Sequence, residues 1–423
     1  MAYQTVKGTY DLLAADVEKF NSLENLFRTF LDLYGYSEVK TPVFEYTGVF
    51  AKENDTSDMV TKEMYTFSPN DKDSLTLRPE GTAGVIRSFV EHKMYGNSEL
   101  PVKLAYIEEM FRHERPQKGR QRQFTQMGVE CIGEKNPLID AETIALGYFY
   151  VKALGLESIK VLINTLGDNE SRLQYKNDLV EYFRPHKDEL CYDCQNRLEK
   201  NPLRILDCKV DKELDVIKNA PKMKLTEAAA NYFEQVKKYL EILGIPYEVD
   251  DRLVRGLDYY TDTVFEVVST REESGSQSTI FGGGRYDNLV KEMGGPEMSG
   301  IGFAIGVERL AILCDAEQIF DEYKPEIDCY VINLNTTADY ALDITSNLRA
   351  LGFTCEMDYY GRSLKAQFKS SERKNARFVV IIGEDEIKNN VVTLKDTLTK
   401  SQETVNKNEL GDRMDQLMED YYE

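Results

Sequence analysis

The sequence predicts an α+β fold in which an antiparallel sheet is flanked by helices, interrupted by a helical insertion and followed by a separate α/β domain. Short strand-like segments joined by polar loops dominate the first part, strand signals stop in the insertion, and β and α patterns alternate near the end. A chain of 423 residues is also too long for one ordinary core. We therefore expect a domain at 1–324, split by the insertion at about 171–223, and a domain at 325–423.

The first elements follow from apolar spacing and turn residues. Apolar residues recur every three or four positions from Val17 to Tyr34, and Gly35 follows, which predicts an amphipathic helix with a glycine stop. A strand over 36–45 should end or lie at an edge near Pro42, because proline donates no ladder hydrogen bond. Two hairpins should follow, pairing 64–67 with 74–78 and, across a basic loop, 105–111 with 122–130.

The middle of the chain returns to helices before the sheet resumes. Helices are predicted over 140–154 and over 226–243, the second between an N-cap at Thr226 and a stop at Gly244. Strands are predicted at 159–166, 247–249, 260–268 and 278–282, and the Gly-Gly-Gly-Arg-Tyr-Asp run at 282–287 is interpreted as a tight turn. The insertion at 171–223 would thus split one sheet.

The last hundred residues alternate between the two patterns. Strands are expected at 329–334, 354–357 and 378–382, and helices at 339–351 and 363–375. Lys365, Lys369 and Arg373 recur every four residues and share one helix face with Arg362. This domain should contain a parallel or mixed sheet and a basic surface.

Composition narrows the possible partners. The net charge of −21 argues against binding to polyanions over the whole surface, yet basic residues are concentrated at 112–122 and at 362–377. No run of 18 apolar residues and no secretion signal is found in the sequence, so we expect a cytoplasmic protein with no membrane partner. The two basic segments would direct a polyanion to chosen places.

The seven cysteines give one noteworthy cluster. Cys191 and Cys194 have metal-ligand spacing, with His186 shortly before them and Cys208 beyond, so a zinc site of three cysteines and one histidine is one interpretation. The other is a small helical insertion with half-buried thiols, because a second CxxC or HxxxH pair is missing. The sequence therefore assigns no metal ligand.

Three segments point to a nucleotide and a small anionic ligand. Arg255 precedes a glycine and the pair Tyr259 and Tyr260, which suits a carboxylate or phosphate with rings beside it. In the basic hairpin, Arg112 can hold a phosphate, Glu114 can accept from an amino group and Phe124 can stack on a heterocycle.

A glycine-containing run at 300–310 supplies a third arginine. Its glycine spacing differs from that of a dinucleotide-binding loop, which disfavours NAD, and it leaves Arg309 near a helix start. Arginines around one nucleotide suit attack by an acid group on the α-phosphate with loss of pyrophosphate. That reaction depends on positioning and charge neutralisation.

Together these segments resemble the three motifs of class II aminoacyl-tRNA synthetases, at 35–45, 111–130 and 300–310. The segments 253–260 and 283–287 narrow the resemblance to the histidyl-tRNA synthetase family, and it covers essentially the whole chain. Asp262 stands where a glycine is frequent in that family. The resemblance implies a class II catalytic domain, an anticodon-binding domain after residue 324 and a homodimer with Pro42 at the subunit interface.

The resemblance also implies roles for individual residues. The histidine-binding residues would be Glu80, Thr82, Arg112, Gln126, Glu130, Arg255, Tyr259 and Tyr260. ATP, with Mg²⁺ on its outer phosphates, would be held by Arg112, Glu114, Arg120, Phe124 and Arg309. Arg255 and Arg112 would be catalytic, with Arg255 bridging the histidine carboxylate and the α-phosphate. Histidyl-adenylate would form first.

The second step would use tRNA-His. Arg115 and Gln117, at the hairpin tip, match positions that read the acceptor end, and the basic face of Arg362, Lys365, Lys369 and Arg373 would meet the anticodon region. The products would be histidyl-tRNA, AMP and pyrophosphate. Two alternatives stay open: a regulatory paralogue of the same fold that binds histidine without acylating tRNA, and an enzyme that adenylates another acyl group.

Overall fold

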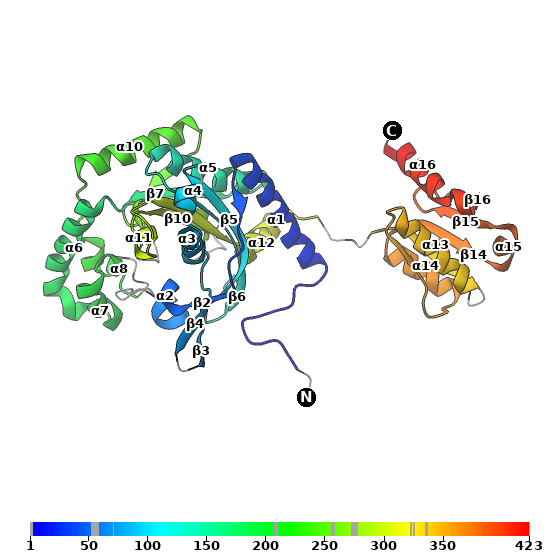
Figure 1. Ribbon diagram of the computed structural model, residues 1–423, viewed down its shortest axis with the longest axis horizontal. Helices are drawn as coiled ribbons and strands as arrows, with labels where there is room; N and C mark the ends of the chain where they lie inside the picture. Colours follow the sequence, from blue (N-terminus) through cyan, green and yellow to red (C-terminus); the bar gives the residue numbers. More distant parts are fainter. Residues whose placement is uncertain are drawn as a thin grey trace. The chain divides into compact units, whose positions relative to one another are not determined.

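The computed structural model contains two compact units, Met1–Phe320 and Asp321–Glu423 (Figure 1). It describes residues 3–51, 59–70, 72–97, 99–117, 119–206, 208, 210–254, 259–271, 278–321, 324, 326–334 and 337–422. The predicted catalytic Arg255 lies outside these described residues. Among the described residues, no helix combines the length and the apolar character needed to cross a bilayer.

The first unit is built on an eight-stranded sheet in the order β1-β5-β6-β11-β10-β9-β7-β8. Its strands are β1 (Ser37–Glu38), β5 (Val102–Phe111), β6 (Gln123–Ile132), β7 (Ile159–Thr165), β8 (Tyr247–Val249), β9 (Thr261–Ser269), β10 (Thr279–Tyr286) and β11 (Gly300–Gly306). The six central strands pair antiparallel, as the sequence predicts, and the two outermost pairs, β1–β5 and β7–β8, are parallel. The pairing of β6 with β11 joins the predicted hairpin to the glycine-containing run.

Helices pack on this sheet and complete its core. They are α1 (Ala15–Tyr34), α2 (Thr47–Phe50), the π-helix η1 (Met59–Glu63), α3 (Thr82–Glu91), α4 (Met94–Asn97), α5 (Pro137–Ala153), α10 (Glu227–Ile242), α11 (Leu289–Glu292) and α12 (Val307–Ala316). Figure 1 shows α5 and α10 together, and α5 contacts β6, β9, β10 and β11. The predicted stop and the predicted N-cap are both confirmed. Gly35 ends α1 with φ 71°, and the Thr226 hydroxyl accepts from the Ala229 N–H at the start of α10.

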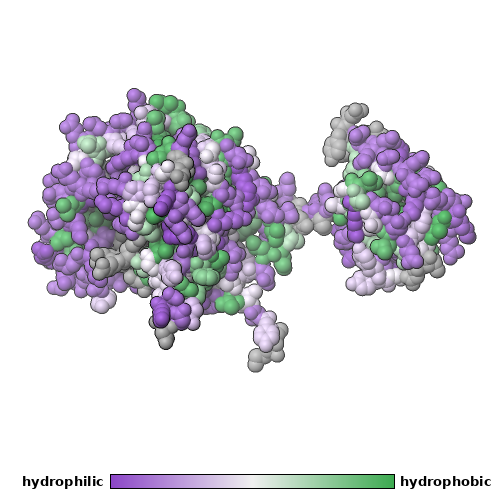
Figure 2. All heavy atoms as spheres, in the orientation of Figure 1, coloured by the Kyte–Doolittle hydropathy of each residue, from purple (hydrophilic) through white to green (hydrophobic). Residues whose placement is uncertain are grey.

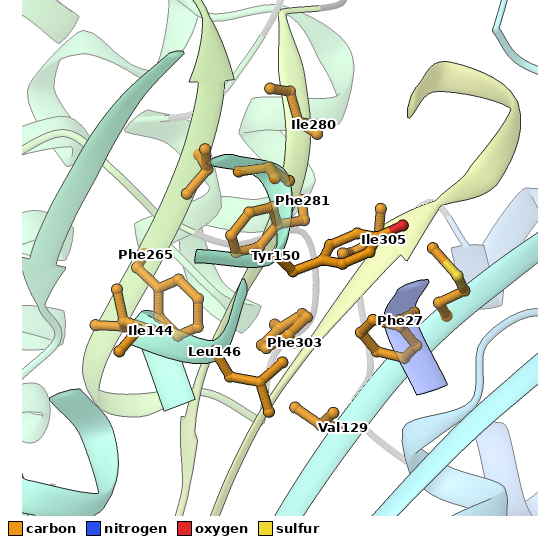
Figure 3. Packing of buried hydrophobic residues seen from close by; sticks show 14 of the residues in the cluster. Phe27, Val129, Ile144, Leu146, Tyr150, Phe265, Ile280, Phe281, Phe303 and Ile305 are labelled. Atoms are coloured by element: carbon orange, nitrogen blue, oxygen red, sulfur yellow. The ribbon is translucent and has the colours of Figure 1, made fainter. Parts of the chain in front are cut away.

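Aromatic rings fill the core between α5 and the sheet (Figure 3). The rings of Phe281 and Phe303 lie 5.0 Å apart, and Phe265 contacts both from β9. On the side toward α1, Phe27 meets Tyr150 edge-on at 5.2 Å. Aromatic pairs of this kind add to the stabilisation from apolar burial, so they strengthen the packing of α5 on the sheet that carries the site.

One predicted strand divides into two. The sequence predicts a strand over 36–45, whereas β1 and β2 (Phe44–Tyr46) belong to different sheets. The chain leaves the large sheet because the Thr41 N–H donates to Glu108 at 2.9 Å, and Pro42 follows. Strand β2 then pairs with β4 (Asp73–Leu77), which pairs with β3 (Thr66–Asn70) in the predicted hairpin.

The predicted tight turn at 282–287 is wrong. Residues 282–286 continue β10, which pairs with β9 on one side and β11 on the other. The glycines are needed for close strand approach, since a Cβ on Gly283 would lie 1.9 Å from the Gly302 carbonyl oxygen. A run of three glycines is typical of a turn by composition alone, and only the neighbouring strands reveal its role.

The insertion is helical, as predicted. It contains α6 (Asn169–Phe183), the 3-10 helix η2 (Arg184–Glu189), α7 (Tyr192–Lys200), α8 (Leu203–Leu206) and α9 (Asp215–Lys218). Its apolar side chains form a small core of their own, with Leu179, Phe183 and Leu198 at its centre. The insertion is therefore a module added to the sheet domain.

The second unit has a five-stranded mixed sheet in the order β13-β12-β14-β15-β16. Its elements are β12 (Ile327–Asn333), α13 (Ala338–Ala350), β13 (Cys355–Met357), α14 (Leu364–Arg373), β14 (Ala376–Ile382), α15 (Glu384–Asn389), β15 (Val391–Asp396), β16 (Gln402–Asn406), the 3-10 helix η5 (Lys407–Glu409) and α16 (Leu410–Tyr422). Strand β12 runs parallel to β13 and β14, and β15 and β16 are antiparallel. Hydrophilic residues dominate the faces in Figure 2, which agrees with the high charged fraction.

Candidate functional site

A cleft of about 590 Å³ lies over the middle of the large sheet. It is lined by side chains from β5, β6, β10, β11, the start of α3, the start of α12 and the helical insertion. The predicted residues that line it are Glu80, Thr82, Arg112, Glu114, Arg120, Phe124, Gln126, Glu130, Tyr259, Tyr260 and Arg309. Segments far apart in sequence thus meet in one cavity large enough for a nucleotide.

A buried carboxyl group marks one end of the cleft. Glu130 on β6 is 1% exposed, and its two oxygens accept from the Thr82 hydroxyl and the Tyr286 hydroxyl, both at 2.6 Å. Burial and, to a smaller extent, the nearby Glu80 raise the pKa of Glu130 to about 8, although these two hydrogen bonds lower it. A ligand that brings a positive charge or an N–H donor would restore the ionised form.

Two carboxyl groups, those of Glu130 and Glu80, are buried closely among their neighbours at this end of the cleft. A Cβ on Gly302, which pairs with Glu130 across β6 and β11, would lie 2.1 Å from the Glu130 Oε2. Glu80 stands at the start of α3, where its oxygens accept from the backbone N–H groups of Thr82 at 2.7 Å and Ala83 at 2.8 Å. Burial raises the pKa of Glu80, although these backbone donors oppose the shift.

Aromatic rings surround the same end. The rings of Tyr259 and Tyr260 lie 4.7 Å apart, and Tyr259 meets Tyr286 edge-on at 5.9 Å. Within the described chain, the Gln126 Oε1 and the Tyr259 and Tyr106 hydroxyls are buried without a hydrogen bond of normal distance and angle. Because buried polar atoms are normally paired, these atoms are suited to bind a small polar ligand.

The other end of the cleft is cationic. The Arg112 guanidinium lies over the Phe124 ring at 5.2 Å, and its Nε donates to the Pro79 carbonyl at 2.7 Å. Arg120 Nη1 lies 2.9 Å from a Glu114 oxygen, so the carboxylate holds that arginine over the cleft. The predicted ATP residues therefore occupy one region, next to the buried carboxyl group.

Arg309 completes this cationic end from the start of α12. Its Nε donates to the Gly119 carbonyl at 3.2 Å. Burial lowers the pKa of Arg309, and the neighbouring cations Arg120 and Arg112 lower it further, although Glu114 opposes them. Three arginines are thus gathered where their own repulsion is unfavourable, which a polyphosphate would relieve.

The two predicted tRNA-contacting groups lie on different parts of the chain. Arg115 and Gln117 are exposed at the tip of the β5–β6 hairpin, where Gln117 and Arg120 bridge a short turn. Lys365, Lys369 and Arg373 are exposed on α14 of the second unit. Arg362 shares that region but is engaged by the Asp358 carboxylate and by the Tyr330 hydroxyl at 3.1 Å, so it also holds the domain together.

Several residues that shape the site do not stand out in the sequence. Tyr286 orients Glu130 although it was placed in a turn, and Tyr106 fills the space beside Gly81 and Gly128, where a Cβ would lie 2.3 Å from its ring. Glu308 accepts from the Thr125 N–H at 2.9 Å and ties α12 to β6. The two glycines beside the Tyr106 ring could have indicated its role. They can be recognised as its neighbours only when the pairing of β5 with β6 is known.

Arg285 and Asp262 support the site from below. Arg285 is completely buried and is bound by the Asp140 carboxylate of α5 and by the Ser299 hydroxyl at 2.5 Å, so it takes no part in the cleft. Asp262, in place of the glycine that the family resemblance leads one to expect, adopts a positive φ of 41° and pairs with Lys135 at 2.6 Å. The aspartate therefore adopts a conformation more usual for glycine.

The fold and the site together define a class. An antiparallel sheet that carries a nucleotide-sized cationic recess beside a polar amino-acid recess, with a separate α/β domain after it, is the arrangement of class II aminoacyl-tRNA synthetases.

Comparisons with known proteins place the chain within that class. The family model described as histidyl-tRNA synthetase matches residues 8–179 and 186–310, and the model described as anticodon binding domain matches residues 328–417. The histidine–tRNA ligase of Bacillus cytotoxicus is 49% identical over 96% of this chain and 97% of its own length. That of Lysinibacillus sphaericus is 47% identical over 98% of this chain and all of its own.

A solved structure agrees with these relatives. Apo histidyl-tRNA synthetase from S. aureus matches with a TM-score of 0.84 and 39% identity, covering 98% of this chain and 100% of its own. The chain belongs to the histidyl-tRNA synthetase family.

Proposed function

We propose that this enzyme activates histidine with ATP to give histidyl-adenylate and pyrophosphate, and then transfers histidine to the 3′ end of tRNA-His with release of AMP. The single observation that carries the proposal is the buried carboxyl group of Glu130 beside the three-arginine recess in one cleft. The Glu130 carboxyl group suits a ligand with N–H donors, and the three arginines suit a triphosphate. Membership of the histidyl-tRNA synthetase family supports both assignments.

Histidine would occupy the end enclosed by Glu130 and the tyrosines. Its imidazole N–H groups would donate toward Glu130, and Gln126, Tyr259 and Tyr260 would complete the pocket. Its α-amino group would be received by Glu80 and Thr82. An amino acid without hydrogen-bonding groups would leave these buried atoms unpaired, so rejection on the order of 10⁴-fold is attainable without editing.

ATP would occupy the cationic end. Its adenine would stack on Phe124, opposite the Arg112 guanidinium, and its phosphates would meet Arg112, Arg120 and Arg309. Mg²⁺ would supply further charge neutralisation on the outer phosphates, and Glu114, which lines this end of the cleft, fits as a hard oxygen donor for it. The domain at 1–324 would therefore be the catalytic domain.

The first chemical step needs little proton transfer. The histidine carboxylate attacks the α-phosphate, a P–O bond forms, and the bond to pyrophosphate breaks. Arg112, held by the Pro79 carbonyl and by Phe124, would stabilise the charge that develops on the α-phosphate, together with Arg255. Arg255 is carried over from the family resemblance, since it lies outside the described residues.

In the second step, the terminal ribose hydroxyl of tRNA-His attacks the carbonyl carbon of the adenylate, and AMP leaves. Arg115 and Gln117 are exposed where an acceptor end could meet the hairpin, and the domain at 325–423 would bind the anticodon. Lys365, Lys369 and Arg373 would contact its phosphates. Because Arg362 is engaged within its own domain, we assign it a smaller share of that contact.

We also propose a cytoplasmic homodimer. The sheet formed by β2, β4 and β3 exposes Phe44, Tyr46 and Phe67, whose exposed fractions are 52%, 64% and 43%. Exposed aromatic side chains gathered on one sheet favour a partner surface, and Pro42 lies two residues before the start of β2. Sedimentation would test this proposal, and an active monomer would contradict it.

The deciding experiment is amino-acid-dependent exchange of pyrophosphate into ATP, run with each of the twenty amino acids and without tRNA. Exchange with histidine alone, followed by charging of tRNA-His, is the expected result. Histidine binding without exchange would instead identify the regulatory alternative. Exchange with a different acid would identify another acyl-adenylating enzyme.

A further inference from the structure

Four potential metal ligands lie together in the helical insertion. They are the thiols of Cys191, Cys194 and Cys208 and the carboxylate of Asp211, and their ligand atoms all lie within 4.8 Å of one another. Cys194, Cys208 and Asp211 are buried, whereas Cys191 is half-buried. The cluster is therefore enclosed on most sides and has one accessible ligand through which an ion could enter.

The local fold brings these groups together. Cys191 directly precedes α7, and Cys194 lies in its first turn, so the two thiols are held one helical turn apart. Cys208 follows α8, and the Asp211 carboxylate accepts from the Cys191 N–H at 2.9 Å. His186, the fourth ligand considered from sequence, instead contacts Glu189 at 2.7 Å and is not among the four. The histidine interpretation is therefore replaced by Asp211.

The separation of two of the sulfurs fits a shared metal ion better than a disulfide. The Cys191 and Cys208 sulfurs are 3.7 Å apart, and all seven cysteines are free thiols. A disulfide requires ~2.05 Å between sulfurs. With Zn–S bonds of ~2.3 Å, the edge of a regular tetrahedron is ~3.8 Å, which matches the observed pair.

We propose that Cys191, Cys194, Cys208 and Asp211 form a structural site for one thiophilic divalent cation, Zn²⁺. Three soft thiolates favour zinc over magnesium or calcium, which prefer oxygen ligands. Four protein ligands close the tetrahedron, which is the arrangement of structural sites and leaves no open position for a reacting water. The four ligand atoms lie within 4.8 Å of one another, a range that extends beyond the ~3.8 Å edge of a regular tetrahedron around zinc. The ligands would therefore move slightly inward when the ion binds.

The site has a structural task within the insertion. The insertion's core is small, with Leu190, Leu198 and Ile205 packed beside Cys194 and Cys208. Modules with small cores commonly need an additional crosslink. The ion would join the start of α7 to the segment after α8, adding a crosslink to the Cys191–Asp211 hydrogen bond and to the packing of that core.

The same segment forms one wall of the catalytic cleft. Cys191, Cys208 and the neighbouring Asp193 line the cleft, and Lys62 Nζ reaches Asp193 at 3.1 Å from the sheet domain. Loss of the ion would therefore loosen a wall of the substrate cavity without removing a substrate ligand. This inference does not depend on which amino acid the enzyme activates.

The first test is the metal content of the full-length protein, purified under reducing conditions without chelator and measured by mass spectrometry of the elements. We expect about one Zn per chain. Protein prepared with Co²⁺ in place of zinc should show the visible absorption of a tetrahedral cobalt site and a near-ultraviolet thiolate charge-transfer band. No bound metal together with no cobalt spectrum would overturn the proposal.

Variants locate the site. Cys208→Ser and Asp211→Asn should each reduce the bound metal at least tenfold. His186→Ala and Cys314→Ala should keep it, the second because Cys314 is a buried thiol in the sheet domain. Loss of metal in His186→Ala with retention in Asp211→Asn would contradict the assignment, as would an intramolecular Cys191–Cys208 disulfide found under anaerobic preparation. Because wild-type metal content is measured first, a variant that fails to fold does not decide the question.

Discussion

At the scale of single residues, we expect the specificity for histidine to depend on Glu130. Its pKa of about 8 in the folded protein lies above the ordinary value of 4.5 because the carboxyl group is buried. The folded protein therefore holds a proton that the unfolded chain has lost between these two values. The contribution of Glu130 to stability is accordingly greatest at low pH and decreases as pH rises from about 4.5 to about 8.

Replacing Glu130 with Gln tests this directly, because glutamine stays neutral. We expect the variant to lose part of the decline in unfolding free energy between pH 5 and 8, an effect on the order of a few kcal/mol. Histidine-dependent pyrophosphate exchange should fall at least 10²-fold. Urea unfolding at several pH values measures the first effect, and an unchanged slope would show that Glu130 is ionised in the folded protein.

Gly302 is a second residue with a sharp expectation. Gly302→Ala would place a methyl group 2.1 Å from the Glu130 Oε2 and 2.3 Å from the Val129 carbonyl oxygen, so backbone or carboxylate must move. We expect a loss of ~1–3 kcal/mol in unfolding free energy and a higher KM for histidine. Gly306→Ala in the same strand is the stability control, since nothing lies within 4 Å of its added Cβ. Equal stabilities of the two variants would argue against the close contact.

At the scale of elements, the exposed face of α14 can be separated from catalysis. Lys365→Glu with Lys369→Glu should raise the KM for tRNA-His about tenfold or more and weaken its salt dependence, because both side chains would contact phosphates. Pyrophosphate exchange without tRNA should stay unchanged. Lys388→Glu with Lys400→Glu, two exposed lysines outside this face, is the control matched in charge. Equal effects of the two changes would assign the loss to net charge alone.

The elements also show where sequence patterns are sufficient. Amphipathic spacing and glycine stops predicted α1 and α10 almost to the residue, because helix ends depend on local groups such as the Thr226 hydroxyl. The same local reasoning misplaced residues 282–287 and joined β1 to β2. Both errors arose where partners distant in sequence decide the conformation, namely Gly302 in the first case and Glu108 in the second.

At the scale of the whole molecule, the two compact units suggest separable tasks. We expect a chain ending at residue 320 to keep histidine-dependent pyrophosphate exchange within a few-fold of the full chain, because every described cleft residue lies in the first unit. Charging of tRNA-His should fall by at least 10²-fold. Exchange and charging assays on both proteins check this expectation, and loss of exchange in a folded truncated chain would contradict it.

For the candidate site, the sequence predicted which residues take part, and the structure showed their surroundings. Motif resemblance predicted eleven residues that line the cleft, among them Arg112, Glu130 and Arg309, because their chemistry and spacing are visible in the chain. The sequence did not show how buried those residues are or which charges lie beside them. Burial sets the pKa of Glu130, crowding of cations lowers that of Arg309, and Asp358 engages Arg362 away from the basic face.

The sequence alone determined the family, the fold class, the positions of most helices and the chemical types gathered for histidine and ATP, since these depend on local pattern and residue identity. Only the tertiary structure decided which groups meet. In the structure, Glu130 accepts a hydrogen bond from Tyr286, and Asp211, not His186, lies with the three cysteines. The glycine run lies in a central strand and not in a turn. Strand register and burial produce these results, and both are set by residues far apart in the chain.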